Sequence, residues 1–136
     1  MRLLHAGRYA VSAPRLGTRQ AREALCRAYG QGYRSVAIAL LHSYRNPEHE
    51  TTLGERARQQ GFTQVSLSHE TSALIKLVSR GDTTVADAYL TPILKRYVTQ
   101  VRDALGPGTV DRLMFMQSNG GLTDADMFHG RDSILS

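Results

Sequence analysis

The sequence predicts an α/β fold built on a parallel sheet, and three consecutive segments support that prediction. Residues 35–41 form a short, nearly all-apolar run after a glycine-rich turn, as expected of a strand that is covered on both faces. Residues 48–60 have the character of a helix, and residues 65–67 form a second short strand. A strand, a helix and a second strand at this spacing are typical of a βαβ unit.

The ends of two helices are predicted from residues that commonly cap helices. Thr18 suits the N-cap of a helix that ends at Gly30, because its hydroxyl can accept a bond from an early backbone N–H. Asn46 and Pro47 suit the start of the helix over 48–60, and Gly61 suits its end.

Apolar residues recur every three or four positions over residues 83–105, which predicts a third helix. We expect this helix to begin at Asp82 or Thr83, because Gly81 is a helix breaker. Pro92 falls inside the helix, where it removes a backbone hydrogen bond, so a kink or a break is expected just before it.

A turn with two glycines follows a further apolar run over residues 112–117. If that run is a buried strand, the turn lies at its carboxyl end, where open α/β sheets bind ligands. Successive N–H groups in such a turn can form an anion nest, and a plain hairpin turn is the alternative. The turn consists of Gln117, Ser118, Asn119, Gly120 and Gly121.

The net charge of +5 is confined to the beginning of the chain. The first 34 residues hold seven arginines and one acidic residue, whereas the remainder holds ten basic and eleven acidic residues. We therefore predict no nucleic-acid partner.

No apolar run approaches the roughly 18–20 residues of a membrane span, so no membrane partner is predicted either. Cys26 is the single cysteine, which fits a reducing compartment, and we predict a cytoplasmic protein.

Residues 1–17 have no sustained hydrophobic period and are interpreted as an N-terminal extension or a truncation remnant. An Arg-rich and acid-poor segment is also typical of a mitochondrial presequence. An edge strand over residues 8–12 is a third interpretation.

Motifs for phosphate loops and metal sites are not matched. No segment follows the Gly-x4-Gly-Lys-Ser/Thr pattern of a P-loop. His42, His49 and His69 lack the spacing of a zinc-binding helix, and we predict no metal site in this chain.

Several long motifs resemble the hydantoinase A/oxoprolinase family. The match runs without a shift from about residue 35 to the end, whereas the first 34 residues are much less recognisable. Within the family, the motif Arg80-Gly-Asp-Thr-Thr-Val-Ala-Asp-Ala-Tyr-Leu-Thr-Pro92 resembles the oxoprolinases more than the hydantoinases or acetone carboxylases. The matching motifs cover residues 36–50, 65–70, 80–92, 96–98, 113–122 and 133–136.

The resemblance implies an actin-like ATPase fold, which is ribonuclease H-like, and a much longer chain. The family's two phosphate loops are absent from these residues, so an internal fragment spanning the end of one domain and the start of the next is implied. Residues 18–80 would be the C-terminal part of the family's N-terminal domain, and residues 83–136 would begin the catalytic domain. Residues 1–17 would be the extension.

The activity implied by the resemblance is an ATP-dependent hydrolysis that opens the lactam of 5-oxo-L-proline to L-glutamate through a phosphorylated amide. ATP and Mg²⁺ are the implied cofactors, and the isolated chain is not expected to be competent. The implied partners are a cyclic amide, either 5-oxoproline or hydantoin, and the rest of its own polypeptide or a second hydantoinase-type subunit.

The best site candidate, supported by the resemblance, is the turn over residues 117–121, which would face nucleotide or substrate. His42, Arg45, Arg80 and Asp87 are weaker polar candidates beside a strand end or a domain seam. They could instead tie loops together or, for Asp87, cap a helix. A hydantoinase A-type subunit that acts with a partner is one alternative function, and a non-catalytic remnant or interaction module is another.

Overall fold

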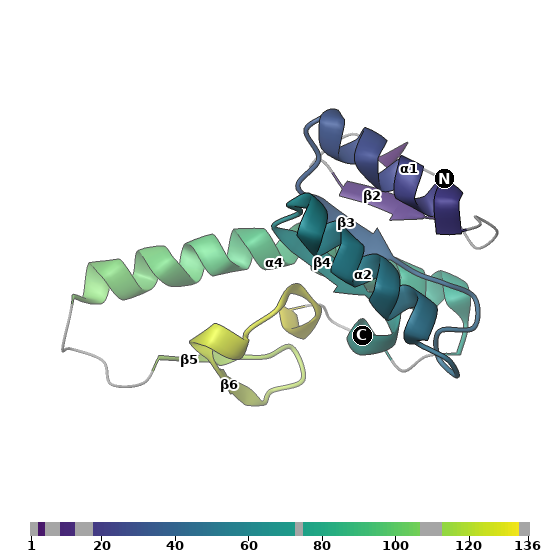
Figure 1. Ribbon diagram of the computed structural model, residues 1–136. Coiled ribbons are helices and arrows are strands. Elements are labelled where there is room, and N and C mark those ends of the chain that lie inside the picture. Colours follow the sequence, from purple (N-terminus) through teal and green to yellow (C-terminus); the bar gives the residue numbers. More distant parts are fainter. Residues whose placement is uncertain (1–2, 5–8, 13–17, 73–74, 107–112, 134–136) are drawn as a thin grey trace.

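The computed structural model describes residues 3–4, 9–12, 18–72, 75–106 and 113–133 (Figure 1). The strands are β1 (Leu3–Leu4), β2 (Tyr9–Ser12), β3 (Ser35–Ile38), β4 (Gln64–Leu67), β5 (Met114–Met116) and β6 (Leu122–Asp124). The α-helices are α1 (Thr18–Gly30), α2 (Glu48–Gln60), α3 (Ser68–Thr71) and α4 (Leu77–Leu105). Two 3-10 helices follow, η1 (Ala125–Met127) and η2 (Gly130–Ser133).

Four strands form one sheet in the order β1-β2-β3-β4. Strands β2, β3 and β4 are parallel, and β1 pairs antiparallel with β2. Helix α1 connects β2 to β3, and α2 connects β3 to β4, so the predicted βαβ arrangement occurs twice in succession. The strand considered at residues 8–12 exists as β2, but it lies inside the sheet and not at its edge.

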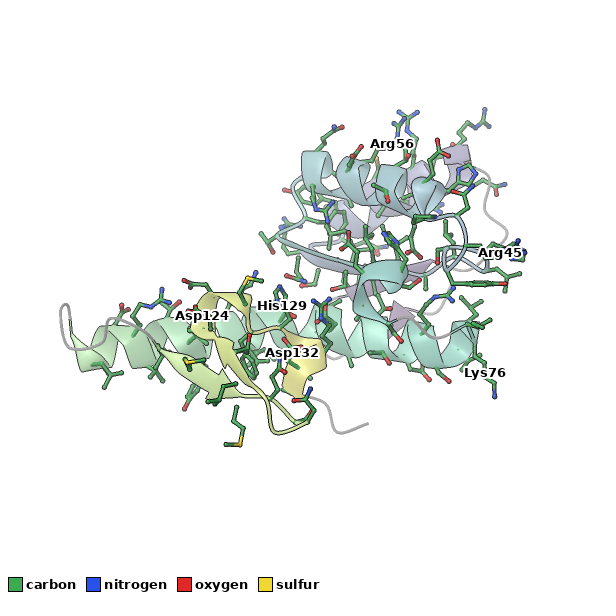
Figure 2. The ribbon with its side chains drawn as sticks, turned by 90° about the horizontal axis from the view of Figure 1, so that it is seen from below. Arg45, Arg56, Lys76, Asp124, His129 and Asp132 are labelled. Atoms are coloured by element: carbon green, nitrogen blue, oxygen red, sulfur yellow. The ribbon has the colours of Figure 1, made fainter. Side chains whose placement is uncertain are left out.

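Helices cover both faces of the sheet, as the near-continuous apolar character of β3 predicts. Helices α1 and α2 pack together on one face, and α4 crosses the other face against β3 and β4 (Figures 1 and 2). The apolar core lies between the sheet and the first two helices. It contains Ala21, Leu25, Ala28, Tyr33, Val36, Ile38, Leu53, Ala57, Phe62 and Leu67.

The predicted ends of α2 are confirmed by the local geometry. The Asn46 side-chain oxygen accepts a hydrogen bond from the backbone N–H of Glu48 at 3.2 Å, next to Pro47 at the helix start. Gly61 ends the helix with φ +103°, a left-handed conformation that favours glycine.

Helix α4 begins at Leu77, so the prediction of a start at Asp82 or Thr83 is wrong. Asp82 and Asp87 lie inside the helix and do not cap its start, which corrects the capping interpretation of both. Gly81 costs a helix only about 1 kcal/mol, and the hydrogen bonds of the neighbouring Arg80 to Ser68, Ile75 and Leu40 offset that cost. The proposed domain boundary near residues 80–83 therefore falls within a continuous helix.

The same helix continues through Pro92, so no break occurs there. Proline removes one backbone bond and disfavours a helix interior by about 3 kcal/mol. The packing of this part of α4 offsets the cost, since Ala88 and Thr91 are fully buried. Beyond the sheet, the last turns of α4 extend away from the four strands and run beside the β5–β6 hairpin (Figure 1).

Strands β5 and β6 pair antiparallel in a separate two-stranded sheet. Met116 is 70% exposed and its cross-strand partner Leu122 is 61% exposed, so the buried strand expected over residues 112–117 is not found. Phe115 is half-buried, and its ring stacks on Phe128 with centroids 5.3 Å apart and meets Tyr97 edge-on. An aromatic cluster therefore helps to hold the hairpin against α4.

A second contact fixes the hairpin segment on α4 by close approach. A Cβ added to Gly130 would lie 2.9 Å from the Asp87 carbonyl oxygen and 2.9 Å from Leu90 Cβ. We expect Gly130→Ala to lower the free energy of unfolding by about 1–3 kcal/mol, because η2 must move off the helix. Urea unfolding followed by circular dichroism measures this loss.

The matched control for that change is Gly81→Ala on the same helix. A Cβ there would meet only Ala39 Cβ at 3.9 Å, an ordinary contact. We expect this variant to be unchanged or more stable by up to about 1 kcal/mol. Equal effects of the two alanines would contradict the close approach at Gly130.

Candidate functional site

A fully buried arginine marks the carboxyl ends of β3 and β4. Arg80 donates from Nε to the Ser68 hydroxyl at 2.9 Å and from Nη1 to the Ile75 carbonyl at 3.2 Å. Its Nη2 donates to the carbonyl of Leu40 and, at 3.4 Å, to that of Leu41. One guanidinium thereby joins the start of α4 to the loop after β3 and to the residue after β4.

Glu50 in the first turn of α2 is the anionic partner of this cluster and is also fully buried. One carboxylate oxygen accepts from the Leu40 backbone N–H at 2.8 Å and from the Ser68 hydroxyl at 2.6 Å. The other accepts from the His69 backbone N–H at 3.0 Å and contacts the His69 ring at Nδ1. The Ser68 hydroxyl thus forms hydrogen bonds with both the carboxylate and Arg80, so it bridges the two buried charges. We call Glu50, Ser68, His69 and Arg80 the strand-end cluster.

The strand-end cluster is saturated with internal hydrogen bonds. Ser43, also buried, donates to the Leu40 carbonyl at 3.0 Å and shares a 3.1 Å bond with Ser68. Within the described part of the chain, no buried side-chain nitrogen or oxygen lacks a partner. The geometry therefore fixes the positions of two loops and a helix at the sheet edge where α/β folds bind ligands. It offers no free buried group for a reacting atom.

A second buried carboxylate, Asp87, connects β4 to the C-terminal segment. Its Oδ2 accepts from the Ser66 hydroxyl at 2.7 Å. Its Oδ1 accepts from the Thr91 hydroxyl at 3.1 Å and from the Arg131 backbone N–H at 3.0 Å. The Thr91 hydroxyl in turn accepts from the Gly130 N–H at 2.8 Å. Asp87 thus holds the sheet, α4 and η2 together.

The predicted turn over residues 117–121 is the loop of the β5–β6 hairpin. Backbone N–H groups of Gln117, Ser118 and Gly120 donate to carbonyls within the chain, at 2.7–2.9 Å. The N–H of Gly121 donates to the Asn119 side-chain oxygen at 2.8 Å, and Gly120 has φ +84°. These amides are committed internally and do not form an anion nest, so the exposed side chains remain the groups that could meet a ligand.

The other two predicted residues, His42 and Arg45, lie in the loop after β3 and are exposed. The His42 carbonyl accepts from the N–H groups of Arg45 and Asn46, which closes a local turn. Figure 2 shows Arg45 at the end of the molecule opposite to Asp124 of the hairpin. The structure therefore brings His42 and Arg45 to the same sheet edge as Arg80, but it does not bring the hairpin turn there.

Glu50, Ser68, His69 and Ser43 were not predicted as site residues. A signal for two of them was present, because Ser43 and Ser68 follow two strands whose parallel pairing could be predicted. Glu50 lies in the first turn of α2, where an acidic residue is favoured by the positive end of the helix, but that position alone does not indicate its other contacts. Its reach back to the Leu40 N–H depends on the loop conformation, which has no local sequence signal.

The described residues do not form a recognisable metal or nucleotide-phosphate site. Within that part of the chain, no three His, Cys, Asp or Glu side chains lie close enough together to hold a metal ion. The amides of Gln117, Ser118, Gly120 and Gly121 are engaged, as described above, so this turn offers no backbone cradle for a triphosphate. Over the same ranges, no helix has the length and apolar composition needed to cross a membrane.

Two solved structures contain a segment with the same backbone fold as this chain. The ATP-dependent caprolactamase from Pseudomonas jessenii superposes with a TM-score of 0.78 at 28% identity, covering 85% of this chain and 17% of that chain. A nucleotide-free acetone carboxylase superposes with a TM-score of 0.72 at 21% identity, covering 87% of this chain and 18% of that chain. The chain is thus part of an α/β unit of the actin-like ATPase fold.

Sequence comparison then defines the family. The hydantoinase/oxoprolinase N-terminal region matches residues 8–61, and the hydantoinase/oxoprolinase domain matches residues 80–136. The 5-oxoprolinase of Saccharomyces cerevisiae is 48% identical over 108 residues, which is 79% of this chain and 8% of that protein. The chain therefore belongs to the hydantoinase/oxoprolinase family, and it spans less than a tenth of the yeast relative.

Proposed function

We infer that this chain is a structural part of an ATP-dependent cyclic amide hydrolase that converts 5-oxo-L-proline to L-glutamate. The observation that supports this best is the 48% identity to a 5-oxoprolinase, together with the place of its most specific motif. That motif, residues 80–92, supplies Arg80, Asp87 and Thr91, which are the buried centres of both hydrogen-bond networks. The residues that resemble the oxoprolinases most are therefore the ones that set this part of the fold.

The chemistry requires help from a phosphoryl donor, because a lactam amide is resonance-stabilised and its nitrogen is a poor leaving group. ATP, with Mg²⁺, would supply phosphoryl transfer that activates the amide oxygen in the complete enzyme. This chain's part is to hold loops and helices in fixed positions, and accurate positioning can contribute about 7–11 kcal/mol to catalysis.

We also propose that the protein acts in the cytoplasm and that it works with the remainder of a longer polypeptide or with a second subunit.

A substrate comparison tests the proposed reaction. The natural polypeptide that contains this sequence is expected to release phosphate from ATP in the presence of 5-oxoproline, with one glutamate formed per phosphate. The isolated 136-residue chain is expected neither to bind ATP tightly in calorimetry nor to hydrolyse it. Turnover of hydantoin with no response to 5-oxoproline would contradict the substrate. Tight ATP binding by the 136 residues alone would contradict the structural role.

The hairpin turn is the part of this chain that we propose contacts substrate or nucleotide, through the side chains of residues 117–121. We expect Asn119→Ala to lower kcat/KM for 5-oxoproline by about tenfold, as for the loss of one hydrogen bond. Gln100→Ala, an exposed amide on α4, is the matched control and is expected to leave kcat/KM unchanged. Full activity of Asn119→Ala would show that the segment is only a turn.

A further inference from the structure

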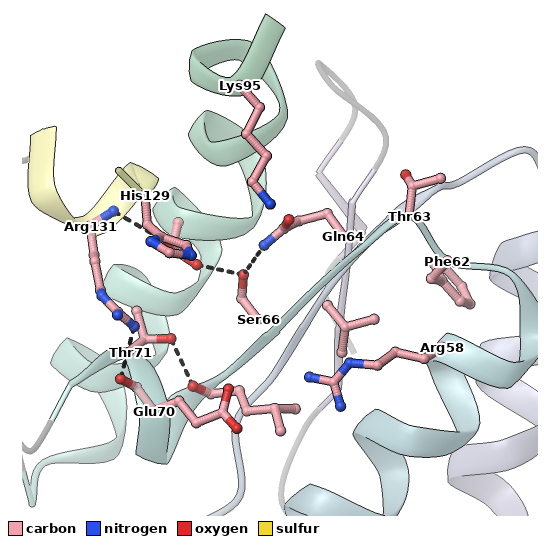
Figure 3. Close-up of a pocket in the computed structure, with 13 residues that line it drawn as sticks. Arg58, Phe62, Thr63, Gln64, Ser66, Glu70, Thr71, Lys95, His129 and Arg131 are labelled. Atoms are coloured by element: carbon pink, nitrogen blue, oxygen red, sulfur yellow. Dashed lines mark hydrogen bonds between the residues drawn. The ribbon is translucent and has the colours of Figure 1, made fainter. Parts of the chain in front are cut away.

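A polar cleft of about 490 Å³ lies beside β4, the edge strand of the four-stranded sheet (Figure 3). Its walls come from five places in the chain: the end of α2, strand β4, α3, the middle of α4 and η2. The residues that line the cleft include no member of the hairpin turn over 117–121 and no member of the strand-end cluster. The cleft is thus a separate feature of the fold.

Three cationic side chains from different elements line this cleft. Arg58 comes from α2, Lys95 from α4 and Arg131 from η2. Figure 3 shows the Lys95 ammonium and the Arg58 guanidinium directed into the space between the elements. Among the described residues, neither Arg58 nor Lys95 has a carboxylate within ion-pair distance, so both charges are available to a ligand.

Arg131 is held in the wall of the cleft by the surrounding structure. Its Nη1 donates to the Glu70 carbonyl at 3.0 Å, and its backbone N–H donates to Asp87 at 3.0 Å. Its Nε forms an ion pair with Asp132 at 3.8 Å. One guanidinium is therefore oriented before any ligand arrives, which lowers the entropic cost of binding.

Two carboxylates also line the cleft, and their positions limit their effect on a bound anion. Asp87 is buried and accepts three hydrogen bonds, from Ser66, Thr91 and the Arg131 backbone, so its charge is already solvated by the protein. The Glu70 side chain is 51% exposed, and its carboxylate lies 3.9 Å from the His69 ring. Three cations on three walls therefore face two carboxylates, of which one is buried and hydrogen-bonded and the other is half-exposed.

We propose that this cleft binds the phosphate group of a small phosphorylated molecule or inorganic phosphate. A phosphate group presents oxygens in several directions and can meet cations from separate walls, whereas a carboxylate presents two oxygens in one plane. The volume lies within the roughly 300–1,000 Å³ of ordinary small-molecule pockets, so it leaves room for an organic part beyond the phosphate. This site is independent of the proposed hydrolase reaction.

Titration of the 136-residue chain with inorganic phosphate, followed by ¹H–¹⁵N NMR, tests the proposal. Amide signals of Ser66, Lys95 and Arg131 are expected to shift and saturate at constant ionic strength. Arg58→Gln and Lys95→Gln are each expected to weaken binding by about threefold to fivefold, the range for solvent-exposed ion pairs. Arg56→Gln and Arg96→Gln remove exposed arginines one or two positions away and are expected to leave the affinity unchanged.

The choice of anion separates the two possible sources of the phosphate. Tighter binding of a phosphate monoester, such as glycerol phosphate, than of inorganic phosphate would identify a phosphorylated small molecule, and the reverse would identify free phosphate. Succinate binding as tightly as phosphate would overturn the proposal. Equal losses in the control variants, or shifts spread evenly over the basic surface, would overturn it too, because they indicate unspecific charge attraction. Since this assay needs no ATP hydrolysis, its outcome is separate from that of the substrate comparison.

Discussion

Replacing Arg80 by methionine is expected to lower the free energy of unfolding by about 3–5 kcal/mol, the cost of breaking a buried charge pair from one side. The guanidinium is fully buried, and its loss removes the donor to the Ile75 carbonyl and one of the donors to the Leu40 carbonyl, which keeps its bond from Ser43. It also leaves the buried Glu50 carboxylate without the guanidinium to which Ser68 links it. Urea unfolding followed by circular dichroism measures the change in midpoint.

Two companion variants make the Arg80 result interpretable. Arg96→Met removes an exposed arginine from the same helix and is expected to change stability by no more than about 0.5 kcal/mol. Arg80→Lys keeps the charge, but its compact ammonium cannot reach the acceptors that Nε, Nη1 and Nη2 of the guanidinium meet separately. We therefore expect an intermediate loss, measurable even if the methionine variant fails to fold. An Arg80→Met midpoint equal to that of Arg96→Met would contradict the strand-end cluster.

Glu50→Gln is the second substitution with a large expected effect. The carboxylate accepts from the backbone N–H groups of Leu40 and His69 and from the Ser68 hydroxyl, so an amide must turn its NH₂ toward at least one buried donor. An unsatisfied buried donor costs about 1–3 kcal/mol, and we expect a loss at the upper end of that range. Urea unfolding again provides the measurement.

The matched control for this change is Glu55→Gln, an exposed glutamate on the same helix, which is expected to have little effect. The double variant of Glu50 and Arg80 adds a test of coupling. Residues in one hydrogen-bond network interact by about 0.5–3 kcal/mol, so the double variant should lose less stability than the two single changes predict together. If the losses in the free energy of unfolding of the two single variants simply add in the double variant, Ser68 does not couple the two charges.

Local signals were sufficient to predict much of the first half of the fold. The βαβ unit follows from an apolar strand at 35–41 and from the caps at Asn46 and Gly61, each of which acts on its own neighbours. The start of α4 was mispredicted because Gly81 disfavours a helix locally, whereas the hydrogen bonds of Arg80 to Leu40 and Ser68, which are distant in sequence, stabilise it. Met116 was expected inside because apolarity alone does not show what covers a strand.

The candidate site was predictable to a smaller extent. Arg80 was placed beside a strand end from a motif, and it lies there, but its partners come from Ser68, the loop after β3 and the segment before α4. Such clusters form between segments far apart in sequence, so no spacing reveals them. Asp87 was interpreted as a cap for the same reason, because its contacts with Ser66 and Arg131 depend on packing.

A segment exchange tests most directly whether this chain performs the structural role of a 5-oxoprolinase segment. The corresponding residues of the yeast 5-oxoprolinase, which are 48% identical over 108 positions, would be replaced by those of this chain. The exchanged enzyme is expected to retain 5-oxoproline-dependent release of phosphate from ATP and to lose it when Arg80→Met is added. An exchanged enzyme that unfolds at the same urea concentration as the parent but hydrolyses no ATP with 5-oxoproline would contradict the account.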